Sequence, residues 1–526
     1  MANHDGQSGC SSCGGGGGRL KAVTDAAGRR TEYEYDAVGW LFKVTHSGET
    51  GYVQFGYDAV GRRTSLLDTR LPAELGGQTY SWTYDALGRV VSETYPGGGT
   101  VSWTYDALGR RRTMTDPDGN VTTYTYANTA GNRRLVSLAH PFSGTTSFSY
   151  DSRGRLAQVV PANCDLGTLF EYDALDRLRA VTHGECGGPS AYHREEYTYN
   201  AASMRTRIDY SREEAGIMVP DSHRLFAYDR VGRLVEEHKR RAGDHVTQYR
   251  YAYTYDPAGN RTQMVHFDGS TTVTTWYSYN AGNQLTGRTL DTGPEWDYVY
   301  DANGNQVWEL DAAAGQTGWW RGHNRENRLT RVERRVNGTT VSSVAYAYDA
   351  MGRLLLRTAA DGSMVRSYYD GINTLLERQR YFTHYDGWRW WTLRVYTLAQ
   401  AAIGQIAGER TMTAWHPQTG APTAWSDRWY HYDMLGNVTG ELDASGLVQS
   451  HVRMEAFGTV LAGGQIGRRL TTKTYDPAAG LYDFSATWLS PHLGLFLSVD
   501  PVVSGLQSPY ILAFQGPVHG VGPNGK

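Results

Sequence analysis

At 526 residues, the chain is long enough for three or four ordinary globular domains. It contains 37 Tyr, 15 Trp and 62 Gly but only 17 Pro, which suits short strands joined by tight turns and argues against disorder. Its 51 basic and 54 acidic residues give a net charge of −3 without a marked Lys/Arg run, so we predict no nucleic-acid partner. No run of 18 apolar residues occurs, which excludes a membrane-spanning helix.

Residues 1–18 are rich in Gly and Ser, and we predict that they form a flexible tail. They lack the apolar centre of a secretory signal peptide. We therefore expect either an export route that is not encoded here or an internal piece of a longer chain. Cys10 and Cys13 form a C-x-x-C, but no second Cys pair or His cluster lies nearby, so we predict no metal site and no cofactor.

We predict a repeat region over residues 19–370, in which the phrase Y-D-x-x-G-R/N and its degenerate copies recur at steps of 21 to 29 residues from Tyr35 to Tyr300. Such a period is the signature of a repeat architecture. The first four copies are Tyr35, Asp36 and Gly39; Tyr57, Asp58 and Gly61; Tyr84, Asp85 and Gly88; and Tyr105, Asp106 and Gly109.

One copy can be followed residue by residue. Tyr33 and Tyr35 alternate with glutamates, which is the two-residue period of a strand with one buried face. The carboxylate of Asp36 can accept bonds from the backbone N–H groups of a turn, and Gly39 supplies the positive φ that closes it. A second strand-like run follows, so each repeat is predicted to be a strand–turn–strand unit.

Because a lone hairpin is marginal in water, neighbouring repeats must pair edge to edge. About fifteen copies predict an all-β fold, a long antiparallel sheet of roughly thirty strands that twist winds into a spiral or hollow shell. We expect the repeat tyrosines to stack on their neighbours as a cross-strand ladder. The alternative is a surface of exposed rings that binds a carbohydrate.

Cys164 and Cys186 each lie 14 residues after a repeat tyrosine, so they occupy equivalent positions in consecutive repeats. Equivalent positions of two-strand repeats lie about 9–10 Å apart, too far for an unstrained disulfide. Both cysteines nevertheless fall in loop-like sequence, where the chain could close that gap. A disulfide between them is a hypothesis that the sequence leaves open.

The regular spacing ends near residue 370. Residues 371–425 are rich in Trp and Ala and carry no repeat signature, so they are either an irregular insert or a continuation of the sheet. His384 lies among aromatic residues with no second His or Cys at metal-ligand spacing, and we predict that it is packed and not catalytic.

Residues 426–526 carry a different pattern, which contains YDMLGN, TYDPAAGLYDFSATWLSPHLGLFLSVDP and SPYILAFQGPVHGVGPNGK. The repeats resemble the YD repeats of the RHS (rearrangement hot spot) family, and this segment resembles the RHS-associated core domain. The resemblance covers roughly residues 19–526. It implies a hollow β-cocoon closed at one end by the core, as in toxin-complex C components, bacterial polymorphic toxins and the YD shells of teneurins.

In many members of that family, a toxin follows the core, is enclosed in the lumen and is severed by an aspartyl autoprotease built into the core. Its pattern needs an Arg before paired tyrosines and two aspartates, because one carboxylate activates water while the other protonates the amide. Here Asp500 keeps the first aspartate, but Thr487 stands at the Arg position and Gly522 at the second aspartate. Trp488 and Leu489 replace the tyrosines. We therefore predict an inactive protease, in which Asp500 caps a turn.

Three functions follow as hypotheses. The first is a structural container that encloses a cargo polypeptide or joins a toxin-complex partner, secreted or at the surface of a bacterial cell. The second is an adhesion protein that binds a cell-surface glycan, and the third is a self-cleaving protease shell. For the third, Asp500 is the candidate catalytic residue.

Overall fold

The computed structural model describes residues 19–127, 133–162, 164, 167–184, 192–215, 217–293, 295–383, 387–398, 406–416, 421–443, 447–454, 456, 458–462, 470–499 and 510. Within these ranges the chain consists of β-strands, turns and two short 3-10 helices, and it has no α-helix. None of the helices in this described part is long and apolar enough to cross a membrane.

Thirty-six strands make one sheet. Its first eighteen strands are β1 (Ala22–Thr24), β2 (Arg30–Tyr35), β3 (Leu41–His46), β4 (Tyr52–Tyr57), β5 (Arg63–Asp68), β6 (Thr79–Tyr84), β7 (Val90–Thr94), β8 (Thr100–Tyr105), β9 (Arg111–Thr115), β10 (Val121–Tyr126), β11 (Leu135–His140), β12 (Gly144–Tyr150), β13 (Leu156–Val160), β14 (Thr168–Tyr172), β15 (Leu178–Gly184), β16 (Tyr192–Tyr199), β17 (Arg205–Glu214) and β18 (Ile217–Tyr228). The other eighteen are β19 (Leu234–Arg241), β20 (Thr247–Tyr255), β21 (Arg261–Phe267), β22 (Thr272–Tyr279), β23 (Leu285–Leu290), β24 (Glu295–Tyr300), β25 (Gln306–Asp311), β26 (Gly318–His323), β27 (Leu329–Val336), β28 (Thr339–Tyr348), β29 (Leu354–Ala359), β30 (Met364–Asp370), β31 (Asn373–Thr383), β32 (Gly387–Leu398), β33 (Ile406–Trp415), β34 (Pro422–Tyr432), β35 (Val438–Leu442) and β36 (Val448–His451).

Two smaller sheets follow in the chain. The first has two strands, β37 (Arg453–Met454) and β38 (Val460–Ala462), and the second has four, β39 (Thr474–Asp476), β40 (Leu481–Asp483), β41 (Trp488–Ser490) and β42 (Leu495–Phe496). The 3-10 helices are η1 (Ala73–Leu75) and η2 (Leu470–Thr472). We call residues 470–499 the inner segment.

Each strand of the large sheet pairs antiparallel with the next strand of the chain, beginning with β1 on β2 and β2 on β3. In the repeat hairpins the register shifts at the motif tyrosine, for example at Tyr35 and at Tyr57. Such a bulge bends its strand and strengthens the local right-handed twist. A bend repeated in every copy winds the sheet, and the predicted spiralling antiparallel all-β fold is confirmed.

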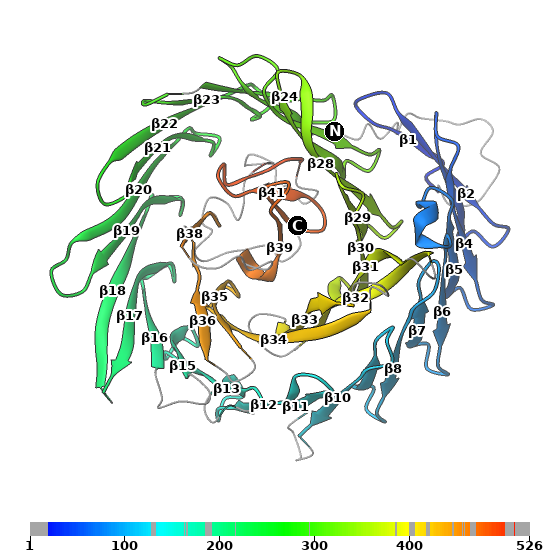
Figure 1. Ribbon diagram of the computed structural model, residues 1–526, viewed down its shortest axis with the longest axis horizontal. Helices are drawn as coiled ribbons and strands as arrows, with labels where there is room; N and C mark the ends of the chain where they lie inside the picture. The colour runs from blue at the N-terminus through cyan, green and yellow to red at the C-terminus, as the bar shows by residue number, and fades with distance from the viewer. Residues whose placement is uncertain are drawn as a thin grey trace.

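The sheet makes a spiral whose later strands pass inside the first ones (Figure 1). Strands β1 to β8 lie outside β28 to β33, and the four-stranded sheet lies near the centre (Figure 1). Contacts between the two turns join residues 298, 260, 254 and 219 positions apart, at Arg29–Asn327, Glu93–Arg353, Ser143–Thr397 and Glu237–Ala456 respectively. Because fewer residues complete each later turn, the spiral tightens inward.

We call this contact between residues 25–237 of the outer turn and residues 303–456 of the inner turn the overlap. The largest hydrophobic cluster lies here and includes Leu66 and Leu138 of the outer turn and Leu355 and Leu376 of the inner turn. A single sheet that packs on one side leaves its other face exposed to solvent. Where two turns of the spiral overlap, the facing surfaces of the sheet are buried against each other. Among the described strands β1 pairs only with β2 and β36 only with β35, so hydrogen bonds do not join the two ends of the sheet.

Within residues 371–425, the described residues form β31, β32, β33 and the start of β34 as members of the large sheet. The segment for which the sequence allowed an insert or a sheet continuation therefore continues the sheet where it is described. The inner segment packs on the concave side of the wall, where Leu481, Trp488 and Leu497 join Val332 and Tyr346 in one apolar cluster.

Candidate functional site

The repeat turn is held by the side chains that recur in the motif. In the second copy, Asp58 Oδ1 accepts the N–H groups of Val60 and Arg62, at 3.0 and 2.9 Å. Arg62 Nε donates to Asp58 Oδ2 at 2.6 Å, and Gly61 has a φ of +85°. The pKa of Asp58 is lowered, because these hydrogen bonds outweigh the effect of desolvation. Equivalent turn geometry surrounds Asp36 and Gly39, Asp85 and Gly88, and Asp106 and Gly109.

The motif tyrosine joins its repeat to the preceding one. Tyr84 donates its hydroxyl to the Arg63 carbonyl at 2.6 Å, and the Arg62 guanidinium lies 4.8 Å from the centre of its ring. The same bond to the preceding repeat recurs at Tyr35, Tyr57, Tyr105, Tyr150, Tyr172, Tyr228 and Tyr255. The sequence predicts rings stacked on rings, but the ladder is built of Arg–Tyr contacts and hydroxyl bonds. The motif includes the Arg that follows the glycine, but the prediction assigned it no role. Its fixed spacing of four residues from the motif Asp is the signal that the two side chains pair.

This bond can be tested with Tyr105, whose hydroxyl donates to the Val90 carbonyl at 2.7 Å. Tyr105→Phe is expected to lower the free energy of unfolding by about 1 kcal/mol, the usual net worth of such a bond. Tyr105→Leu should cost more, because the Arg89 guanidinium 4.5 Å away loses its ring. Urea unfolding measures both; a Phe variant as stable as the wild type would contradict the linking role.

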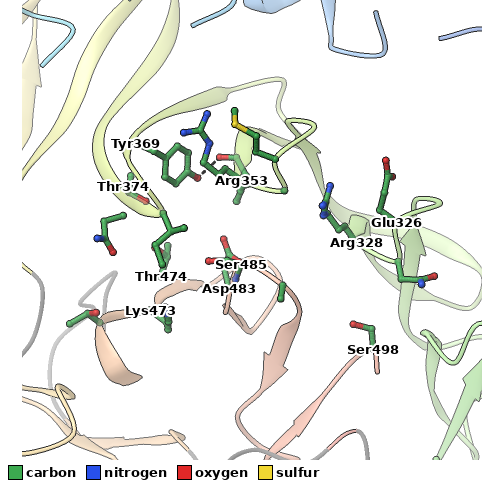
Figure 2. Close-up of a pocket in the computed structure, with 18 of the residues that line it drawn as sticks. Glu326, Arg328, Arg353, Tyr369, Thr374, Lys473, Thr474, Asp483, Ser485 and Ser498 are labelled. Atoms are coloured by element: carbon green, nitrogen blue, oxygen red, sulfur yellow. Dashed lines mark hydrogen bonds between the residues drawn. The ribbon is translucent and has the colours of Figure 1, made fainter. Parts of the chain in front are cut away.

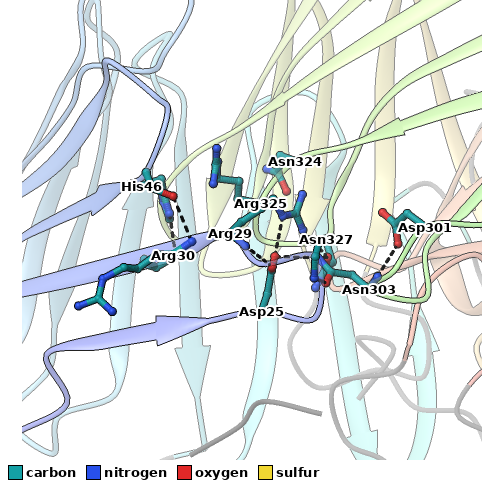
Figure 3. A network of polar contacts seen from close by, with 12 residues as sticks. Asp25, Arg29, Arg30, His46, Asp301, Asn303, Asn324, Arg325 and Asn327 are labelled. Atoms are coloured by element: carbon teal, nitrogen blue, oxygen red, sulfur yellow. Dashed lines mark hydrogen bonds and ion pairs between the residues drawn. The ribbon is translucent and has the colours of Figure 1, made fainter. Parts of the chain in front are cut away.

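A polar network closes the overlap near β1 (Figure 3). Asn303 Nδ2 donates to Asp25 Oδ2 at 2.8 Å, and Asp25 also receives Arg29 Nε at 2.6 Å. Further along the outer turn, Arg325 Nε donates to Glu49 at 2.9 Å. In each pair the two side chains lie in the loops of hairpins that are nearly three hundred residues apart in the sequence. No local sequence pattern therefore reveals that they meet.

Deeper in the overlap, Arg353 is bound by groups of both turns. Its Nε donates to Asp349 Oδ2 and its Nη2 to Glu93 Oε1, both at 2.7 Å, and Nη1 donates to the Tyr95 hydroxyl at 3.2 Å. Arg353, Glu93 and Asp349 are 8%, 5% and 0% exposed. Burial raises the pKa of Tyr95 and keeps it a neutral phenol. This cluster is an ionic clasp between the turns.

A cavity of about 480 Å³ separates the inner segment from the wall (Figure 2). Asp483 and Ser485 of the inner segment lie opposite Tyr369 of the wall, whereas the guanidinium of Arg353 points away from them toward the outer turn (Figure 2). Thr474 also lines the cavity, whose borders combine charged, polar and aliphatic side chains. The described part of the chain has no group of three or more His, Cys, Asp or Glu side chains that could hold a metal ion.

The family's protease positions are only partly described. Thr487, at the Arg position, is 3% exposed, and its Oγ1 lies 2.6 Å from Ser498 Oγ. Trp488 Nε1 donates to the Tyr348 hydroxyl at 2.9 Å, so this side chain anchors the inner segment to the wall. Leu489 is fully buried beside it. Asp500 and Gly522 lie outside the described residues.

The cysteines can be located in part. Cys164 is disulfide-bonded. Cys186, its proposed partner, lies outside the described residues, as do Cys10, Cys13 and His384. The pairing therefore stays a prediction.

Comparisons with known proteins agree with the repeat geometry. Residues 17–162 match the family model Teneurin YD-shell, and residues 228–271 and 323–364 match RHS Repeat. The chain is 24% identical over 387 residues to the tRNA3(Ser)-specific nuclease WapA of Bacillus spizizenii, which covers 68% of this chain and 14% of that protein. It is 25% identical over 355 residues to Toxin subunit YenC1 of Yersinia entomophaga, which covers 60% of this chain and 35% of that one.

Among solved structures, the Photorhabdus luminescens Tc holotoxin pore aligns with a TM-score of 0.34 at 16% identity, over 96% of this chain and 33% of that chain. The chain thus spans about a seventh and a third of the two curated relatives. The family models fall on stretches of YD hairpins, which are the units that build the sheet. The chain therefore carries the YD and RHS repeats of the RHS/YD-repeat family, wound into one long spiralling antiparallel sheet.

Proposed function

We propose that this chain is the wall of a shell that encloses or isolates a cargo polypeptide, as a component of a secreted or surface-borne bacterial toxin. The observation that carries the proposal is that the spiral already holds a polypeptide without repeats, the inner segment, against its concave face. The similarity to Toxin subunit YenC1 supports the toxin setting, with a second toxin-complex protein as the partner.

The wall binds the inner segment through side chains and backbone. Asp476 accepts Arg357 Nε at 2.6 Å and Nη2 at 2.9 Å, together with the Tyr346 hydroxyl at 2.7 Å. The backbone N–H of Gln306 donates to the Leu497 carbonyl at 2.8 Å. Since backbone groups present the same donors in any sequence, such a wall can hold chains of varied sequence.

The proposed role does not use the chain's own proteolysis. A dyad needs two carboxylates, and the sequence keeps only Asp500 of the pair. Thr487, which stands at the position of the family's Arg, is neutral, and its buried hydroxyl is hydrogen-bonded to Ser498. We therefore propose that this copy of the autoprotease is inactive.

Enclosure is tested by extending the chain beyond Lys526 with an unstructured peptide that carries protease sites. An enclosed peptide should be cut far more slowly than the same peptide fused to the chain's N-terminus. Intact mass should show no self-cleavage. Equal cutting rates would remove the container role, and a cut product that disappears in Asp500→Asn would show an active protease.

The seat of the inner segment gives a further prediction. Asp476→Ala leaves Arg357 without its carboxylate at a site where Asp476 is 4% exposed. The change should weaken the packing of the inner segment on the wall by about 2–3 kcal/mol. Chymotrypsin should then cut faster at Phe484 and Phe496, which are buried in the wild type. The control Asp209→Ala removes an exposed ion pair with Arg207 and should leave that rate unchanged. Equal rates in Asp476→Ala and the wild type would mean that this carboxylate does not hold the segment.

A further inference from the structure

Four histidines meet where the outer turn crosses the inner turn. His183 of β15 stacks on His431 of β34, with ring centres 4.2 Å apart and ring planes 15° apart. His193 of β16 lies edge-on to His451 of β36, with ring centres 4.5 Å apart. Both contacts join residues of different turns. His183 and His431 are buried, His193 is half-buried and His451 is exposed at the rim.

The strand registers place the four rings in one cluster. His183 and His193 are directly opposed on β15 and β16. His431 and His451 lie two strands apart and are both opposed to Gly440 of β35. A Cβ at Gly440 would lie 3.2 Å from His431 Nδ1, so the glycine gives the stacked ring its room.

We propose that this histidine cluster is an acid-sensitive lock, which holds the two turns together when its rings are neutral and loosens the overlap when they are protonated. Neutral imidazoles can stack face to face. Two imidazolium rings at the same separation repel each other, and the repulsion is strong because both rings are buried.

Charged groups of both signs surround the cluster. The cluster borders a cavity of about 340 Å³, whose cationic lining is Arg194, Arg205, Arg212, Arg224 and Lys239. Its carboxylates are Glu195, Asp221 and Asp433. Asp433 is held by its own turn, where it accepts the backbone N–H groups of Leu435 and Asn437. Asp221 Oδ2 accepts the Ser222 hydroxyl.

The pKa values follow from this setting. Burial, with the positive charge of the neighbouring histidines, lowers the pKa of His183 to about 3 and that of His431 well below its usual value. Burial and His451 lower the pKa of His193 to about 4. The unfolded chain takes up these protons near pH 6.5, so stability is lost as the pH falls from about 6.5 toward 4.

Glu195 acts in the opposite direction. Burial and the charge of Asp433 raise the pKa of Glu195 to about 7, so its protonation stabilises the fold as the pH falls from 7 toward 4.5. Over the same pH range, the three histidines with lowered pKa values destabilise the fold by more than this one carboxyl group stabilises it. The neutral glutamic acid also offers no negative charge to an imidazolium at pH 5, so the net response is loosening.

Hydrogen–deuterium exchange at pH 7.5 and pH 5.0, corrected for the intrinsic exchange rate, tests the lock. In the wild type, protection of β34 to β36 should fall by roughly tenfold or more at pH 5.0, while β8 and β9, which contain no histidine, keep theirs. H183F/H431F keeps two stacked rings that cannot titrate, and its loss should be less than about threefold. The control His266→Phe removes a histidine outside the cluster whose pKa is also lowered and whose ring stacks on Tyr251. In this variant, β34 to β36 should lose protection as they do in the wild type.

Unchanged protection of the wild type at pH 5.0 would overturn the lock, and so would an equal loss in H183F/H431F. Should that double variant fail to fold, His193→Asn at the more open pair should still shift the loss to lower pH; no shift would also overturn it. The link from loosening to cargo release rests on the proposed enclosure. The exchange experiment needs no cargo, so failure of the lock and failure of enclosure remain distinguishable.

Discussion

Arg353→Met is expected to lower the free energy of unfolding by about 3–5 kcal/mol. The buried carboxylates of Glu93 and Asp349 each lie 2.7 Å from Arg353, and they would lose their cation at a site where they are 5% and 0% exposed. The rings of Tyr80, Tyr95 and Tyr369 surround the guanidinium with centres 5.2 to 5.6 Å from it, so they can supply no charge in its place. Urea unfolding measures the loss.

A matched control exists because Arg353 is also a repeat arginine. Arg62 makes the same turn contact to Asp58, and its further contacts, to the Asp85 carbonyl and the Tyr84 ring, lie within the outer turn. About a third of its side chain is exposed, so Arg62→Met should change stability little. Adding Glu93→Gln and Asp349→Asn to Arg353→Met should restore part of the loss, since no uncompensated charge remains. If Arg353→Met and Arg62→Met were equally mild, the clasp would contribute no more than an ordinary turn.

Gly97→Ala is the second change with a large expected effect, a loss of about 2–5 kcal/mol in the free energy of unfolding. Gly97 has a φ of +69°, and a Cβ there would lie 1.7 Å from the Leu75 carbonyl oxygen of η1. A backbone atom cannot move aside as a side-chain tip can, so the turn and η1 must separate. The cost adds overpacking, about 1–3 kcal/mol, to the strain of a left-handed alanine.

The neighbouring Gly98 isolates the two causes. It has a φ of +97°, and a Cβ added there would meet no atom within 4 Å, so Gly98→Ala should cost only the backbone strain, about 1–2 kcal/mol. Thermal unfolding of both variants, with their circular dichroism compared, measures the difference. Equal losses would mean that η1 yields easily and that the turn is not fixed against it.

The repeat could be predicted because it is local. Tyr57, Asp58 and Gly61 lie within five residues, and the contacts of their turn form within that span, so the sequence pattern contains the geometry. The partner of each motif tyrosine lies in the preceding repeat, as the bond from Tyr84 to the Arg63 carbonyl shows. The prediction of ring-on-ring stacking between repeats was wrong for these contacts. The cause is that ring stacking and a hydroxyl bond both satisfy a half-buried tyrosine, and the register chooses between them.

The sequence by itself determined that the chain forms antiparallel hairpins, that they pair edge to edge, and that their twist winds the sheet. Only the tertiary structure decided which strands meet across the overlap. Arg353 meets Glu93, and His183 meets His431, because each bulge adds a small bend and the sum over about 250 residues sets the pitch of the spiral. A small change in the bend at each bulge would change which residues meet across the overlap. A sequence pattern of a few residues cannot determine the total bend of so many strands.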